Sequence, residues 1–303
     1  MPATQEPELK AKIADFLTHC KARNLSPHSV HGYRIDLEYL ADYLGQTPVS
    51  QINRKTIRSF IALLSELGAS PATLRRRLAC VKEFCTYLHS QGLIDAGLIR
   101  SIRGPRPHDT LPDVPSETDI RRLLEGTIPG SCPSRDRALL ELLYGAGLRA
   151  SEVVGIDLGD LVDDRFVRIH GKGNRDRYAV FGEPCQKAIA AWLPVRKRLL
   201  KKWGIKTDAL FCSVSSHRSE RLVVRNVNRI VARVAVANGL PKFNPHALRH
   251  ACATHAHDHG MPLQAVSMML GHANLDSTQV YTRTSTKRLT DVYRKAHPHA
   301  RIA

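Results

Sequence analysis

The sequence predicts a mainly α-helical protein of two domains with one small β-sheet. Its 303 residues are about twice the length of a common domain. Apolar residues recur at three- and four-residue steps along most of the chain, which is the period of a helix with one buried face. One stretch, residues 165–182, instead has the pattern of two short strands joined by a Gly-Lys-Gly-Asn turn.

Residues 1–102 are expected to form a helical domain. Ser26-Pro27 and Ser70-Pro71 each place an N-cap serine before a proline at the first helical position, and apolar residues at helical spacing follow. Two more helices, at about 6–23 and 54–67, complete a four-helix bundle.

Three consecutive arginines, Arg75, Arg76 and Arg77, flank the apolar stripe of the helix that follows Ser70. They could contact DNA phosphates, or they could form an ordinary solvated face. The formal net charge of the chain, +17, favours the phosphate contact.

A second domain is expected over residues 116–303, after an extended linker at residues 103–115. The linker carries four prolines and shows no periodicity. Helices are predicted at 116–126 and 135–147, the strand pair follows, and helices return almost to the C-terminus.

The charge of the chain indicates a polyanionic partner. Hydrophobic residues make up 43% and charged residues 24% of the chain, which is ordinary for a folded globular protein. Lysine and arginine total 45 against 28 acidic residues, giving a formal net charge of +17. Such a field attracts nucleic acid, and an anionic membrane surface is the alternative.

The sequence predicts neither a membrane segment nor a disulfide framework. No run approaches the ~20 apolar residues of a transmembrane helix, and the first ten residues lack the features of a signal peptide. The seven cysteines form no Cys-x-x-Cys pair and are odd in number. We expect a cytoplasmic protein with reduced, packed cysteines and no membrane contact.

Two cationic residues of the second domain are positioned to bind an anion. Arg149 follows a glycine-flanked turn and precedes a new helical periodicity, so its guanidinium is expected at a helix start. Taken alone, a structural pairing with Glu152 is the simpler reading. Lys172 lies at the tip of the predicted hairpin, where it could enter a groove or merely solubilise the edge.

The stretch NPHALRHACATHAHDHG, residues 244–260, predicts a helix with a polar face. Asn244-Pro245 marks its start, and His246, Arg249 and His250 share one face. The two histidines have the spacing of the zinc motif His-Glu-x-x-His, but alanine replaces the glutamate and Arg249 would repel a cation. We therefore expect no metal ion. The remaining zinc candidates are His255, His257 and His259.

The end of the second domain predicts a further helix that carries a tyrosine. Gly271 ends one helix, His272 follows it, and Asp276 or Ser277 caps the next. Tyr281 then lies in the first turn, where the positive helix end favours a phosphate. Packing of the aromatic ring is the alternative.

Together these residues favour phosphoryl transfer on DNA. The reaction needs cationic donors on the non-bridging oxygens, a proton donor for the leaving oxygen and a nucleophile. The arginines, lysine, histidines and tyrosine can supply all three. A carboxylate cluster for magnesium, a Walker phosphate loop and a Gly-x-Ser-x-Gly elbow are missing from the sequence. Metal-dependent nucleases, nucleotide hydrolases and serine esterases are therefore disfavoured.

At these residues the sequence resembles the tyrosine recombinases, also called the phage integrase family. Five motifs carry the resemblance, in this order: GLRASE at 147–152, GKGNRDR at 171–177, HALRH at 246–250, LGH at 270–272 and VYTR at 280–283. The combination is far more specific than any one motif. The first domain is similar to the family's SAM-like core-binding domain. In its length, opening and ending, the chain is most similar to the Xer recombinases, which resolve dimers of circular replicons.

The resemblance implies the chemistry. Tyr281 would attack the scissile phosphate to form a 3′-phosphotyrosyl link and release a 5′-hydroxyl, without ATP or another cofactor. Lys172 would protonate the leaving oxygen. His246 would act as general acid and base toward the tyrosine hydroxyl, whose pKa is ordinarily near 10.

The resemblance also implies which residues support that chemistry. Arg149, Arg249 and His272 would hold the non-bridging phosphate oxygens. Glu152 and His250 match accessory positions that orient the arginines and their helix.

The family architecture implies a C-shaped clamp around double-stranded DNA with paired inverted half-sites. Four protomers, of this chain alone or with a sister recombinase, would exchange strands as a tetramer. A septal DNA translocase is a further partner that the resemblance suggests. The final helix, with Leu289, Val292 and Tyr293, would dock on a neighbouring subunit as in relatives, or fold back on its own domain.

The sequence departs from the family pattern after the hairpin. Many relatives have Arg-x-Val-Pro there, whereas this chain has Arg177-Tyr178-Ala179-Val180. The course of the second strand is therefore left open, but no catalytic role depends on it.

Xer-type site-specific recombination is the leading interpretation. An integrase or resolvase of a phage, plasmid or transposon would use identical chemistry on another site. A type IB topoisomerase would relax DNA with the same residues. From another class, the chain could be a DNA-binding protein that does not cleave, in which case Tyr281→Phe would leave its activity unchanged. A zinc hydrolase is the last alternative, and the purified protein would then contain metal.

Overall fold

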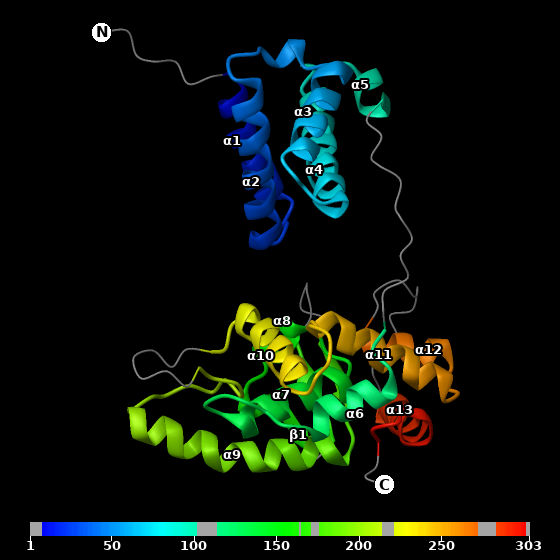
Figure 1. Ribbon diagram of the computed structural model, residues 1–303. Coiled ribbons are helices and arrows are strands. Elements are labelled where there is room, and N and C mark those ends of the chain that lie inside the picture. The colour runs from blue at the N-terminus through cyan, green and yellow to red at the C-terminus, as the bar shows by residue number, and fades with distance from the viewer. Residues whose placement is uncertain are drawn as a thin grey trace. The chain divides into compact units, whose positions relative to one another are not determined.

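The computed structural model describes residues 8–101, 114–163, 165–170, 176–213, 221–271 and 283–300, with the backbone alone at 101 and 283–288. The chain divides into two compact units, unit 1 (residues 1–110) and unit 2 (residues 111–303) (Figure 1). Most of the predicted linker lies outside the described residues. The predicted domain boundaries at 102 and 116, and the C-shaped clamp, therefore stay predictions.

Unit 1 is a helical bundle, as the sequence predicts. The Ser26 hydroxyl accepts a hydrogen bond from Ser29 N at 3.1 Å, and the Ser70 hydroxyl accepts one from Thr73 N at 3.2 Å, so both predicted N-caps are confirmed. The bundle also contains a short 3-10 helix and a fifth helix that the sequence analysis does not predict. Its elements are α1 (Glu8–Ala22), α2 (Pro27–Leu44), η1 (Val49–Gln51), α3 (Arg54–Glu66), α4 (Pro71–Ser90) and α5 (Ala96–Ser101).

The core of unit 1 lies between its helices. Leu37 of α2 and Val81, Phe84 and Leu88 of α4 are fully buried. These positions follow the three- and four-residue period, so each helix presents one apolar face to the others.

Unit 2 is built around α7 (Pro133–Gly145), which contacts α6, α8, α9, α10 and α11. Ten of the eleven residues from 135 to 145 of α7 are buried, so this helix has no broad solvent face. Such a helix lies in the interior of a domain and fixes the helices around it. The other helices are α6 (Glu117–Glu125), α8 (Ala150–Gly155), η2 (Leu158–Asp160), α9 (Glu183–Trp203), α10 (Val224–Ala237), α11 (Pro245–Asp258), α12 (Leu263–Leu270) and α13 (Arg283–Ala296).

The sheet of unit 2 has three antiparallel strands in the order β1-β2-β3. The predicted pair is present as β2 (Phe166–Ile169) and β3 (Arg177–Val180), with Ile169 opposite Arg177. The prediction of two strands was incomplete, because β1 (Leu161–Asp163) adds a third. Three residues are too short to show an alternating pattern, which is why the sequence does not reveal this strand.

The C-terminal segment folds back on unit 2, which is one of the two alternatives for the tail. Tyr293 of α13 is 1% exposed, and its hydroxyl donates to Gly145 O at 2.9 Å. After the helix, His299 Nε2 lies 2.7 Å from Glu141 Oε2. A Cβ atom at Gly182 would lie 2.4 Å from the backbone oxygen of His299, so only glycine allows this approach.

Within the described ranges, no helix combines the length and the apolar character needed to cross a membrane.

Candidate active site

The GLRASE motif forms a tight turn followed by α8, as the sequence predicts. Gly147 has a φ of +59°, and a Cβ atom there would lie 2.7 Å from Leu270 Cδ2 and 3.0 Å from Cys252 Sγ. The turn therefore needs glycine both for its backbone conformation and for its close packing. Arg149 is the N-cap residue of α8, and its backbone N–H donates to Glu152 Oε2 at 2.8 Å.

Glu152 is the carboxylate on which this site is built. Arg177 Nη1 and Nη2 donate to its two oxygens at 2.9 and 3.0 Å, and Arg149 Nη1 donates at 2.9 Å. Burial alone would raise the pKa of Glu152, but the hydrogen bonds from Arg177 and Arg149 outweigh it and lower the pKa. Glu152 is therefore ionised and fixes two guanidiniums in place.

Arg249 of α11 joins the same group from the protein interior. It is 4% exposed and donates to Gly147 O at 2.6 Å and to Leu270 O at 2.7 Å, and its Nη1 lies 3.7 Å from Glu152 Oε2. Burial and the neighbouring Arg149 lower the pKa of Arg249 to about 10, so it keeps its charge at neutral pH. By donating to these two carbonyl oxygens, the Arg249 side chain links the turn before α8 to the end of α12.

Arg177, at the start of β3, is a residue of this site to which the sequence analysis gives no role. It is 8% exposed, and a Cβ atom at Gly271 would lie 2.6 Å from its Nε. That buried Nε has no hydrogen-bond partner among the described residues. The signal was the arginine that closes the GKGNRDR motif, but an arginine after a hairpin is usually an exposed residue.

The arginine–Glu152 cluster (Arg149, Arg177, Arg249 and Glu152) carries an excess of positive charge. Three guanidiniums face one carboxylate, which leaves about two charges uncompensated. The side chain of Arg149 is 46% exposed, so part of the cluster is open to solvent. A partly buried group of arginine forks matches the oxygens of a phosphate.

His246 and His250 lie beside this cluster on one face of α11, as their spacing predicts. Their Nε2 atoms are 3.0 Å apart, so one ring donates to the other. Burial and then the charges of His250, Arg249 and Arg149 lower the pKa of His246. His246 is therefore neutral at neutral pH and exposed, a state in which it can accept a proton.

Three predicted residues, Lys172, His272 and Tyr281, lie outside the described residues, as do the proposed caps Asp276 and Ser277. The described residues before this gap end at Gly271, which packs on Arg177, and β3 begins at the same arginine.

The three predicted DNA-binding arginines of unit 1 have different surroundings. Arg76 donates both Nη atoms to Asp36, whose side chain is fully buried. Arg77 lies 3.6 Å from the same carboxylate and 3.9 Å from the ring centre of Tyr39. Arg75 has no ion pair within the described part of the chain. Of the three, Arg75 has the charge most available to another molecule.

The histidines proposed as a remaining zinc candidate do not converge. His255 Nδ1 lies 3.0 Å from the Tyr144 hydroxyl, His257 Nδ1 lies 3.1 Å from Met261 O, and His259 Nε2 lies 2.7 Å from Glu117 Oε1. Among described residues, no group of three or more histidine, cysteine, aspartate or glutamate side chains could hold a metal ion.

Two family models match the chain. The model described as the phage integrase family matches residues 115–288, and the phage integrase N-terminal SAM-like domain matches residues 13–92. The second match agrees with the predicted SAM-like bundle. The two matches cover most of the helical bundle of unit 1 and most of unit 2.

Curated relatives and solved structures agree with these models. The tyrosine recombinase XerC of Corynebacterium glutamicum is 37% identical over 297 residues, covering 97% of this chain and 94% of the relative. A XerH recombinase bound to its difH substrate has a TM-score of 0.64 at 20% identity, covering 95% of this chain and 82% of that one. A lambda integrase tetramer bound to a Holliday junction has a TM-score of 0.65 at 16% identity, covering 89% and 75%. The fold is therefore shared with these structures, and the chain belongs to the phage integrase family, the tyrosine recombinases.

Proposed function

We propose that this chain is a Xer-type site-specific DNA recombinase that cuts and rejoins DNA through a 3′-phosphotyrosyl intermediate on Tyr281. The observation that carries the proposal is the arginine–Glu152 cluster, in which three guanidiniums from α8, β3 and α11 surround one carboxylate. The nearly full-length similarity to XerC proteins supports the Xer type.

The cluster can stabilise the charge that develops on a scissile phosphate. Arg149 and Arg249 would hold the non-bridging oxygens, because the pentacovalent phosphorus carries more negative charge on these oxygens than the ground state. Glu152 keeps Arg149 and Arg177 in position before DNA arrives, so little reorganisation is needed during the reaction. Arg177 would act as a positioning residue, or donate through its Nε, which has no hydrogen-bond partner in the described ranges.

The remaining groups would move protons. His246, neutral at rest, would accept the proton of the Tyr281 hydroxyl as the tyrosine attacks. Lys172 would give a proton to the leaving 5′-oxygen, and His272 would add a donor to the phosphate. His250 holds His246 through the contact between their Nε2 atoms.

The proposed partner is double-stranded DNA with paired inverted half-sites, bound by a tetramer. The net charge of +17 supports a polyanionic partner. The structural likeness to a lambda integrase tetramer on a Holliday junction and to DNA-bound XerH supports DNA binding and assembly on DNA. A sister recombinase and a septal DNA translocase are finer proposals that follow from the Xer type. A cytoplasmic location follows from the same proposed role.

A nicked suicide substrate tests the proposal. A duplex that carries the host's candidate dimer-resolution site, nicked beside the cleavage position, lets the short 5′-hydroxyl fragment diffuse away and traps the covalent intermediate. The full-length protein is incubated with this duplex in the absence of metal ion and ATP, and the Tyr281→Phe variant is treated in the same way. The products of both reactions are resolved on a denaturing gel. We expect a protein–DNA adduct with the wild type alone.

The outcomes separate the alternatives. An adduct on the candidate site over scrambled DNA supports the Xer type, whereas adducts on another site from a DNA library indicate an integrase or resolvase. Relaxation of supercoiled DNA without pairing of sites indicates a topoisomerase. If binding persists but no adduct forms on any DNA, even with a sister recombinase and a translocase added, the protein binds DNA without cleaving it.

A further inference from the structure

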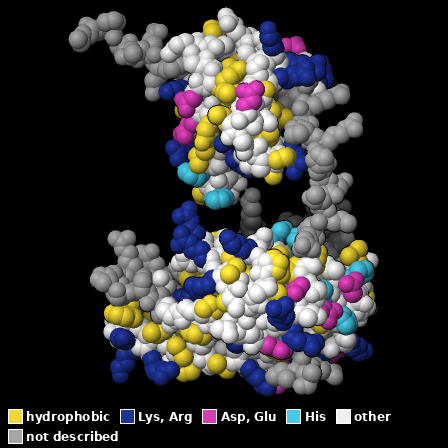
Figure 2. Space-filling model, in the orientation of Figure 1, with side chains coloured by type: hydrophobic (Ala, Val, Ile, Leu, Met, Phe, Trp, Pro, Cys, Tyr) yellow, Lys and Arg dark blue, Asp and Glu magenta, His cyan; other side chains and the backbone are white. Residues whose placement is uncertain are grey.

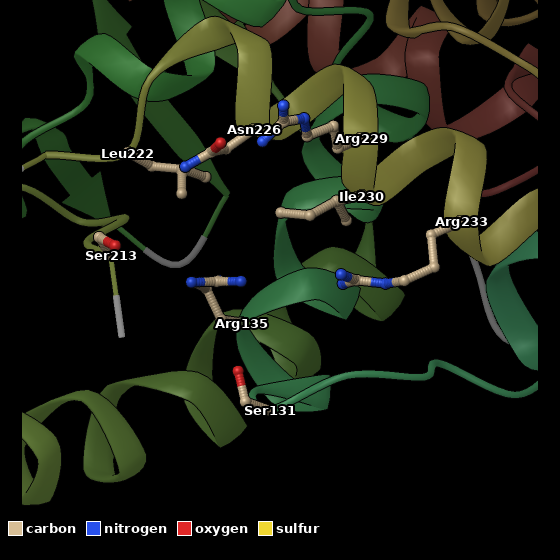
Figure 3. Close-up of a pocket in the computed structure, with 8 residues that line it drawn as sticks. All are labelled: Ser131, Arg135, Ser213, Leu222, Asn226, Arg229, Ile230 and Arg233. Carbon is tan, nitrogen blue, oxygen red and sulfur yellow. The ribbon is translucent and has the colours of Figure 1, made fainter. Parts of the chain in front are cut away.

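A cavity of about 330 Å³ lies between α10 and the start of α7 (Figure 3). Three of its lining residues are arginines, namely Arg135 of α7 and Arg229 and Arg233 of α10. Ser131 and Asn226 add neutral polar groups to the lining. A cavity of this size is large enough for a small ligand.

Two of the three arginines are held in place by one carboxylate. Asp136 has no exposed side-chain surface and accepts from Arg135 Nε and Nη2 at 2.8 and 2.7 Å. Arg233 Nη2 donates to its other oxygen at 2.7 Å. Arg135 Nη1 also donates to Cys212 O at 3.2 Å, so its guanidinium is fixed in the wall of the cavity.

The third arginine leaves the cavity with excess positive charge. Arg229 is exposed and has no acidic partner within the described parts of the chain. Three guanidiniums in the lining and one carboxylate behind two of them leave about two uncompensated charges, the same ratio as in the arginine–Glu152 cluster. Figure 2 shows basic side chains over the part of unit 2 that carries α10.

The start of α7 adds to this field. Ser131 and Arg135 of the lining lie on either side of the N-cap residue Cys132, which makes no side-chain capping bond. The helix has 13 residues, and its N-terminus carries a partial positive charge. An anion in the cavity would therefore meet guanidiniums and a helix N-terminus together.

The cavity is separate from the candidate active site. The lining residue that belongs to α7, Arg135, lies in the first turn of this helix, whereas the turn at Gly147, whose carbonyl oxygen accepts from Arg249, follows its last turn. At 1.5 Å per residue, the 13 residues of α7 separate the two by roughly 20 Å. One phosphate group cannot contact both.

We propose that this cavity is a second phosphate-binding site, in which Arg229 and the held pair Arg135 and Arg233 bind the phosphate oxygens. The arginine fork matches phosphate geometry, and the buried carboxylate presets two of the forks without neutralising the group. The phosphate would come from the backbone of bound DNA or from a free phosphate compound. The DNA source rests on the proposed recombinase function, whereas the free source does not.

Arg229→Gln tests the proposal, with Arg225→Gln as the matched control. Both arginines are exposed on α10, one turn apart, but only Arg229 lines the cavity. Arg229→Lys is a further variant that keeps the charge and loses the fork. Thermal unfolding checks that each full-length variant is folded.

The first arm measures pyrophosphate binding by calorimetry without DNA. All proteins carry Arg149→Gln, which weakens the arginine–Glu152 cluster as a competing site. We expect saturable binding that Arg229→Gln weakens at least fivefold, roughly the loss of one charged hydrogen bond. Arg225→Gln should leave it within about twofold, and Arg229→Lys should fall between them.

The second arm measures DNA binding by salt titration and by ethylation of individual backbone phosphates. If DNA supplies the phosphate, Arg229→Gln should reduce the slope of log K against log salt by about one. It should also abolish interference at one phosphate away from the scissile position. Loss in the first arm alone identifies a free phosphate compound as the ligand, and loss in the second identifies DNA. If Arg229→Gln and Arg225→Gln behave alike in both arms, the cavity is not a phosphate site.

Discussion

In both units of the molecule, arginines converge on one carboxylate with little or no exposed surface, but the charge that remains differs. In unit 1, Asp36 has no exposed side-chain surface and faces two arginines, one of which also lies over a tyrosine ring. In unit 2, Glu152 faces three arginines, and one of them is 46% exposed. The first group joins α2 to α4 and leaves about one positive charge, whereas the second leaves about two positive charges that can bind a ligand.

The difference shows why an arginine motif cannot be read from its charges alone. The triple arginine of α4 is the denser run in the sequence, yet Arg76 and Arg77 are largely engaged with Asp36. The arginines of the Glu152 cluster are spread over about a hundred residues (149 to 249) and gather only in the fold. What marks a phosphate site is the charge that remains after internal carboxylates are counted.

The largest contrast should be in the rate of DNA cleavage. Arg149→Gln is expected to slow single-turnover cleavage of the suicide substrate by about 10²–10³, because it removes one donor to the transition state. Arg76→Gln should leave that rate unchanged. If both variants slow cleavage equally while remaining folded and bound to DNA, the two clusters do not differ in function as proposed.

The next effect should be on stability, in the opposite unit. Asp36→Ala removes the acceptor of two arginines and should lower the free energy of unfolding by roughly 1.5–3 kcal/mol. Urea unfolding, monitored with a spectroscopic probe placed in unit 1, measures this loss. Arg75→Ala, on the same helix as Arg76, is the control and should change stability by less than about 0.5 kcal/mol. An equal loss in the control would mean that Asp36 does not anchor these helices.

Acidic pH should distinguish the two units by its effect on stability, because histidines rather than arginines hold the C-terminal tail of unit 2. Burial, and then the neighbouring His299, His255 and His259, lower the pKa of His297 from 6.5 to about 3. Between these values the unfolded chain binds a proton that the folded chain does not, so stability falls as pH decreases below 6.5.

The slope for this one histidine is about 1.4 kcal/mol per pH unit, which amounts to about 2 kcal/mol between pH 6.5 and about 5. Urea unfolding of unit 2 over this range measures it. His297→Asn should flatten the slope, and the exposed control His257→Gln should not. An unchanged slope in His297→Asn would show that another group is responsible.

The smallest effect should be on the salt dependence of DNA binding, in which the three arginines of α4 are expected to differ. Arg75→Gln is expected to reduce the slope of log K against log salt for DNA binding by about one, the loss of a single phosphate contact. Arg76→Gln should change the slope less, because its charge is compensated by Asp36. Equal changes would mean that the ion pair opens when DNA binds.

Much of the fold could be predicted because the signals are local. The serines before the prolines at 27 and 71, and Asn244 before Pro245, cap helices where the sequence places them. Glycine at 147 and 271 marks turns with positive φ, as required where a helix stops. Strand β1 and helix α5 were missed because elements of three and six residues carry too few positions to show a period.

The candidate site was predicted in part. The motif positions identified Arg149, Glu152, Arg249 and the two histidines of α11, and the fold brings the arginines and the glutamate together. The contact of Arg177 with Glu152 was missed because it joins residues 25 positions apart, one on a strand and the other on a helix. No periodic pattern in a single sequence encodes that pairing.

By itself, the sequence determined the helices, their caps, the tight glycine turns and the excess of positive charge, since these depend on neighbouring residues and on composition. Only the tertiary structure decided which arginines are neutralised and which remain available. That outcome depends on which carboxylate each guanidinium meets and on how far water is excluded around them, and both are set by contacts between distant segments. For the same reason, the cavity between α7 and α10 became visible only in the folded chain.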